Sequence, residues 1–155
     1  MLRHAVDSWA SIYANHAVLR TTIEFLHVGG LLGGGGAAIA ADRTALTRHR
    51  PDVADWLDSF HATHRLVLAG IAVILASGVL LLAADVDTYF YSKVFWTKMG
   101  LFVLLLLNGS QLMRTESAAR RGDERAHLHL RTLAGVSLAL WFLITLAGAA
   151  LPNIS

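Results

Sequence analysis

Four apolar stretches, each about twenty residues long, constrain this chain more than any other feature. They cover residues 22–41, 66–84, 95–113 and 133–151. A helix needs about 20 residues to cross the hydrocarbon core of a bilayer, and only helices satisfy their own backbone hydrogen bonds there at this length. The composition, 55% hydrophobic and 15% charged residues, is also typical of membrane proteins. The sequence therefore predicts an all-α integral membrane four-helix bundle that forms one domain, residues 1–155.

The basic residues predict the orientation of this bundle. The first and third interhelical loops lie on the same side of the membrane, and this side carries nine arginines. The opposite side carries four basic residues. The nine are Arg43, Arg48, Arg50, Arg65, Arg114, Arg120, Arg121, Arg125 and Arg131, and the four are Arg3, Arg20, Lys93 and Lys98. Because basic loops stay in the cytoplasm, both termini are expected on the outer side. The basic balance is thus explained by membrane topology, and we expect the lipid bilayer, not nucleic acid, as the partner.

Aromatic residues mark the outer interface in two places. Residues 1–20 mix polar groups with Trp9 and Tyr13, which is typical of a short interfacial helix or of a polar tail. The loop 85–93 and the start of the third stretch add a group of aromatic rings at the same predicted depth. These are Tyr89, Phe90, Tyr91, Phe95 and Trp96.

The first stretch carries ionisable groups where they are costly. Glu24 and His27 lie in it, three residues apart, and such groups usually mark a site or a buried pairing. On an ideal helix one face holds His27 above small residues, namely Gly30, Gly34, Ala38 and Ala41. This strip favours close packing of a neighbouring helix. A second interpretation is a porphyrin against Gly30 and Gly34 with His27 as axial ligand. Helix packing accounts better for the glycines, but it does not account for the imidazole.

Lys98 is a candidate neighbour of His27. Both residues lie roughly one turn below the outer surface if the first and third stretches cross the membrane in the same direction. One interpretation is a polar cluster of Glu24, His27 and Lys98 in the outer half of the bundle. The other is that Lys98 extends to the headgroups, as lysines near helix ends readily do.

A second group of histidines lies at the cytoplasmic mouth. His61 and His64 are three residues apart and share a helical face, so they could hold a metal ion or a haem, or form an ordinary solvated helix end. They are too far from His27 to share one iron with it. Because the chain has no cysteine, thiolate sites, iron–sulfur clusters and c-type haem are excluded. Glu24 is the only acid inside a predicted span, which argues against a di-iron site.

Two segments of the sequence resemble a group of bacterial four-helix inner-membrane families. These segments are Leu26-His27-x-Gly29, and Phe95-Trp96-x-Lys98 followed by Asn108-Gly109 and Arg114. The group includes the copper-resistance D-type domain, the HemJ-type protoporphyrinogen oxidase and uncharacterised relatives. The resemblance covers roughly a third of the chain. It implies a multi-pass protein of the bacterial inner membrane, with His27 and Lys98 as the functional pair and b-type haem as the cofactor.

The sequence thus favours a membrane protein that binds haem b and takes part in electron transfer or haem-linked oxidation. His27 is the first ligand candidate, and His64 and His61 follow. The alternatives are a non-catalytic subunit or scaffold, and a protein that handles copper or divalent ions through His27, Glu24, His61 and His64. The partners left open are a membrane redox protein, a partner helix and a second copy of the chain.

Overall fold

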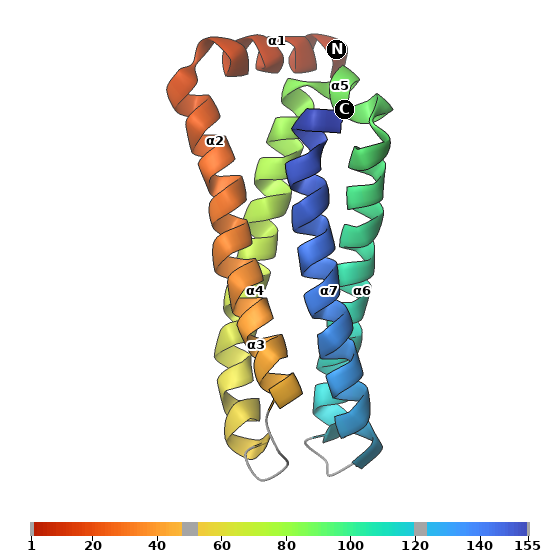
Figure 1. Cartoon of the computed structure of the whole chain (residues 1–155). Helices are drawn as coiled ribbons and strands as arrows, with labels where there is room; N and C mark the ends of the chain where they lie inside the picture. Colours follow the sequence, from red (N-terminus) through yellow and green to blue (C-terminus); the bar gives the residue numbers. More distant parts are fainter. Residues whose placement is uncertain (1, 48–52, 120–123, 155) are drawn as a thin grey trace.

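The computed structural model describes residues 2–47, 53–119 and 124–154, and in these ranges it is helical, without strands. In chain order the elements are α1 (Leu2–Asn15), α2 (Ala17–Gly30), η1 (Leu31–Gly35), α3 (Gly36–Thr47), α4 (Val53–Ala84), α5 (Val86–Tyr91), α6 (Lys93–Ala119) and α7 (Glu124–Ile154). The long helices run side by side, and α1 lies across one end of them (Figure 1). We call this end the α1 end and the opposite one the distal end.

Three of the described helical segments are long and apolar enough to cross a membrane. They are Ala17–Thr47, which comprises α2, η1 and α3, then Thr63–Ala84 of α4 and Leu128–Leu151 of α7. Many of their large apolar side chains are exposed, for example Leu32 (71%) and Leu146 (66%). Exposed apolar surface on this scale is what a lipid environment requires. The structure thus agrees with a membrane class.

Helix α6 differs from these three segments in its composition. It covers the third predicted stretch and packs along α7 over much of its length. It does not reach the same apolarity, because Lys98, Asn108 and Gln111 interrupt it. The Asn108 side chain makes an interhelical hydrogen bond, donating from Nδ2 to the Leu133 carbonyl of α7 at 3.0 Å. The Asn108 side chain therefore links α6 to α7 and is not exposed to lipid.

The α1 end is closed by short helices. Trp9 of α1 donates a hydrogen bond from Nε1 to the Leu80 carbonyl of α4 at 2.9 Å. The loop predicted at 85–93 folds into α5, whose first turn is capped by the Asp85 side chain, which accepts from the Thr88 amide at 3.3 Å. Residues 1–20 therefore form helix rather than an irregular tail, except for the undescribed Met1 and the break at His16.

A turn of π-helix divides the first long segment at its glycine run. Residues Leu31–Gly35 form η1, between α2 and α3. A π turn takes one more residue than an α turn, so the faces of α2 and α3 are out of register by about one residue. Toward the distal end the residues that are buried are Ala38 and Asp42, whereas Ala41 is only half-buried. Ala41, which the ideal helix put on the same face as Ala38, still packs against the buried cluster around Leu130, so Asp42 adds to that face.

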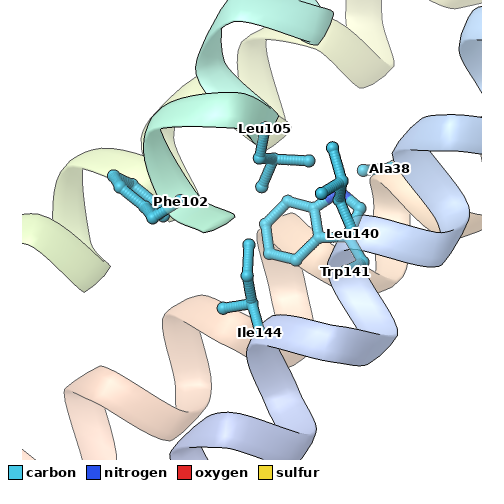
Figure 2. Close-up of a cluster of buried hydrophobic side chains, with 6 residues drawn as sticks. All are labelled: Ala38, Phe102, Leu105, Leu140, Trp141 and Ile144. Atoms are coloured by element: carbon cyan, nitrogen blue, oxygen red, sulfur yellow. The ribbon is translucent and has the colours of Figure 1, made fainter. Parts of the chain in front are cut away.

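The core fills the middle and distal parts of the bundle. Its central residue is Trp141 of α7, which is 3% exposed and packs between α3 and α6. Figure 2 shows its indole ring beside Leu105, Leu140, Ile144 and Ala38. A second cluster around Leu130 and Ala134 packs α7 on α3 and α6 near the distal end. Consequently α7 contacts α3 closely, while α2 packs on α4 instead and diverges from α7 toward the α1 end (Figure 1).

Candidate functional site

His27 lies half-buried between α2 and α4, and its ring is held in one orientation. Its Nδ1 lies 3.0 Å from Ser77 Oγ on α4. Ser77 donates its single hydroxyl proton to the Val73 carbonyl at 2.6 Å. When the Ser77 hydroxyl donates to Val73, its oxygen accepts from Nδ1–H of the neutral His27 ring. The lone pair of Nε2 is then available for a proton or a metal, the arrangement found in metal-ligating histidines.

Lys98 reaches the same region from α6. Its side chain is half-buried and extends to α7, where a Cβ on Gly148 would lie 3.5 Å from the Lys98 Nζ. Its positive charge acts on the His27 ring. His27 and Lys98 thus lie in the same half of the bundle, near α1, on helices that are not closely packed against each other in the described ranges. In this position Lys98 points into the bundle and does not extend along α6 to the surface.

Glu24 does not join this group. It is exposed on α2, and its Oε1 accepts a hydrogen bond from the Tyr13 hydroxyl of α1 at 3.0 Å. Burial and this contact raise the pKa of Tyr13 to about 12. Of the three residues predicted to cluster, Glu24 is therefore paired with α1 instead. Among the described residues no group of three or more His, Asp or Glu side chains could hold a metal ion.

The glycine strip packs helix against helix. A Cβ on Gly34 would lie 2.7 Å from the Gly70 Cα of α4, and one on Gly30 would lie 3.1 Å from the Gly70 carbonyl oxygen. The backbones of η1 and α4 thus touch at glycine, as small residues allow in membrane bundles. Gly30 and Gly34 leave no room for a porphyrin on their own face. The same face is covered by α4 and is not free for a partner helix.

The second predicted group of histidines lies toward the distal end, far along the bundle from His27. His64 is partly buried and lines a cavity between α3, α4, α6 and α7. The side chain of His61 lies outside the described part of the structure. The cavity also contains a residue that the sequence did not single out, Asp42 of α3.

Asp42 is the most deeply buried acidic side chain among the described residues, at 2% exposed. The prediction that Glu24 is the only acid inside a span is wrong, because the first membrane-length helix continues to Thr47. Asp42 was missed because the span was ended at Ala41, where an acid is ordinary at an interface. The sequence did contain a signal that Asp42 faces inward, since it follows the small residue Ala38 by four positions and so shares its helical face. Ser137 then supplies a polar partner within an otherwise apolar stretch.

The known proteins offer no further guide to these two sites. Comparison of the chain with family models, with curated proteins and with solved structures found no match.

Proposed function

We propose that this chain is an integral membrane protein that binds b-type haem near His27 and serves electron transfer or haem-linked oxidation. The observation that carries the proposal is the half-buried His27 ring, whose Nδ1 lies 3.0 Å from Ser77 Oγ, an arrangement that leaves Nε2 for a ligand. Helix packing alone needs no imidazole at this position, and burying one in a bundle is costly unless it has a role. Iron in a haem is commonly held by such a nitrogen.

The donor set and the surrounding helices suit this cofactor. His27 and Lys98 come from different helices, and both are nitrogen donors in a chain without cysteine. The glycine face of α2 is covered by α4, so the cofactor would lie on another side of His27. There α2 diverges from α7 and is not closely packed against it in the described part of the chain (Figure 1). When bound, the haem would supply the one-electron redox chemistry, and the protein would supply His27, oriented by Ser77, and the Lys98 charge.

The proposal includes four membrane crossings. The start of α1 and the end of α7 lie at the same end of the bundle, which takes an even number of crossings (Figure 1). Helix α6, with 27 residues, is long enough to be the fourth. Its polar residues Lys98 and Asn108 turn toward α7 and away from lipid. With the distribution of arginines, this favours outer termini and the inner membrane of a bacterium.

The visible spectrum of the protein tests the proposal. The chain is purified from haem-supplemented cells in mild detergent, and spectra are recorded after oxidation and after reduction. We expect a Soret band in the parent protein and its loss in His27→Ala. Ser77→Ala should weaken haem binding by about tenfold, because loss of an orienting hydrogen bond has effects of this size.

Two other histidines serve as controls. His16 is exposed and bonds to the Ile12 carbonyl of its own segment, so His16→Ala should keep the Soret band. His64→Ala should keep it as well, since His64 lies in the other half of the bundle. A parent protein without a Soret band, or a band lost in His64→Ala and kept in His27→Ala, would overturn the assignment.

A further inference from the structure

The cavity beside Asp42 has the size of a small ring. It measures about 130 Å³ and is lined by four helices. Most of its wall is apolar and includes Val67, Ile71, Leu105 and Trp141. Engineered apolar cavities of about 150 Å³ hold one benzene molecule. The volume therefore suits a single aromatic ring better than a larger cofactor.

The Asp42 carboxyl group is incompletely paired. Among the described residues the Ser137 hydroxyl of α7 is its hydrogen-bond partner, whereas Oδ2 is buried and has none. A buried polar atom without a partner costs about 1–3 kcal/mol, and more if it is charged. Proteins usually satisfy such atoms, so an exception calls for a group that arrives from outside.

The cavity is bordered by residues that face the membrane. Leu68 of α4 is 50% exposed, and Met113 of α6 is 38% exposed, although both line the cavity. Helices α4 and α6 are not closely packed against each other in the described ranges. In a bilayer, exposed apolar side chains at this depth contact lipid. An apolar molecule dissolved in the membrane can therefore approach between α4 and α6.

We propose that this cavity binds a small, largely apolar molecule with a hydroxyl group, such as the ring of a phenol or a quinol, and that Asp42 binds the hydroxyl. A hydroxyl can donate to a carboxylate and can accept from a carboxylic acid, so it matches Asp42 in either protonation state. A Ca²⁺ or Mg²⁺ ion suits the site less, because such an ion takes six or more oxygen ligands and the wall is mostly apolar. His64, also on the wall, offers a second polar group to a ring with two hydroxyls.

Binding requires one local movement. The Oδ2 atom has almost no accessible surface, so the carboxyl group must turn toward the cavity that Asp42 lines. This proposal does not rest on haem binding at His27, because the two sites lie in different halves of the bundle and share no residue.

Two probes of the same shape test the proposal. The full chain is reconstituted in lipid nanodiscs and titrated with 4-fluorophenol or with 4-fluorotoluene, and binding is followed by fluorine NMR against empty nanodiscs. We expect saturable binding of 4-fluorophenol and at least about tenfold weaker binding of 4-fluorotoluene. A hydrogen bond to a charged group accounts for a difference of this size.

Variants of Asp42 separate recognition from packing. Asp42→Ala should weaken 4-fluorophenol binding by about tenfold or more and leave 4-fluorotoluene binding unchanged or stronger, because the cavity remains. Asp42→Asn, which keeps an acceptor, should retain most of the phenol affinity. A merely structural role for Asp42 would instead weaken both probes together.

A further variant keeps the test decisive if the Asp42 variants do not fold. Leu106 lines the cavity from α6 and is 40% exposed, so Leu106→Trp can fill the entrance without changing a polar group. It should reduce the binding of 4-fluorophenol in a folded protein. Equal binding of the two probes, phenol binding that is unaffected by both Asp42→Ala and Leu106→Trp, or a cavity that holds water and neither probe would each overturn the proposal.

Discussion

The two halves of the bundle bury ionisable groups in different ways. Near α1, His27 has a hydrogen-bond partner in Ser77, which is itself bonded to the backbone of α4. Toward the distal end, Asp42 lies beside a cavity and has Ser137 as partner, but one of its oxygens has no partner in the described part of the chain. One half thus holds its side chain in a fixed orientation, and the other leaves an acceptor and empty space. The half near α1 is therefore suited to hold a ligating side chain in a preorganised position. The distal half is suited to take up a small molecule beside Asp42.

The helix packing explains this difference. In the half near α1, α2 packs on α4, and the His27 ring fits against Gly78, where an added Cβ would lie 3.4 Å from its Cε1 atom. In the distal half, α3 packs on α7, and α4 is separated from α6 by the cavity. The change occurs at η1, where the π turn shifts the inward face by about one residue.

The largest effect is expected at the contact that joins the two halves. In Gly34→Ala the new Cβ would lie 2.7 Å from the Gly70 Cα and 3.3 Å from the Val67 carbonyl oxygen, so the helices must separate. We expect the free energy of unfolding to fall by about 1–3 kcal/mol, as measured by SDS titration in detergent. If the halves are coupled through η1, the ligand affinities at both sites will fall as well.

Gly33→Ala is the matched control for this change. A Cβ on Gly33 meets nothing within 4 Å, although it belongs to the same turn. The free energy of unfolding of Gly33→Ala should therefore stay within about 1 kcal/mol of the parent value, because only backbone entropy changes. Equal losses in the two variants would show that the glycines act through backbone conformation and not through the contact with α4.

A pair of serine substitutions compares the two sites directly. Ser137→Ala removes the partner of the Asp42 carboxyl and should lower the free energy of unfolding by about 1–3 kcal/mol. Ser77→Ala removes the partner of the neutral His27 ring and should cost about 1 kcal/mol. Both are measured by the same SDS titration. A larger cost for Ser77→Ala would reverse the comparison and place the more strained group near α1.

The smallest effect concerns the closure of the α1 end. Because the pKa of Tyr13 is raised from 10.0 to about 12 in the folded protein, its neutral form stabilises the contact of α1 with α2. This stabilisation is fully present below pH 10 and is lost as the pH rises through about 12. A tyrosinate absorbance titration should show a late step whose amplitude decreases in Tyr13→Phe.

Glu24→Gln provides the check on its cause. Burial contributes most to the Tyr13 shift, and Glu24 adds to it. The late step should thus move to lower pH in Glu24→Gln but should stay above 10. The pKa of Tyr89 is also raised, by burial, by Asp85 and by Glu24, so that residue should still titrate late in Tyr13→Phe and somewhat earlier in Glu24→Gln. A late step that is unchanged in Tyr13→Phe would contradict the assignment.

Much of the fold follows from the sequence. The apolar stretches predicted the long helices, because in lipid the backbone must satisfy itself within one segment. The similar depth of His27 and Lys98 was predicted from helical rise, and both residues lie in the half of the bundle near α1. The small-residue pattern predicted that another helix could approach α2 closely. These inferences depend on local geometry, which is constant along an ideal helix.

What the sequence did not determine depends on contacts between helices. The helical projection of the first stretch ended at Ala41, but packing of α3 on α7 buried the next residue, Asp42, beside Ser137. Glu24 was expected near His27, and only the docking of α1 turned it toward Tyr13. The sequence alone determined which segments are helical and apolar, because those are properties of single residues and their neighbours. The tertiary structure decided which polar groups are paired, because a partner fifty or ninety residues away is chosen by packing.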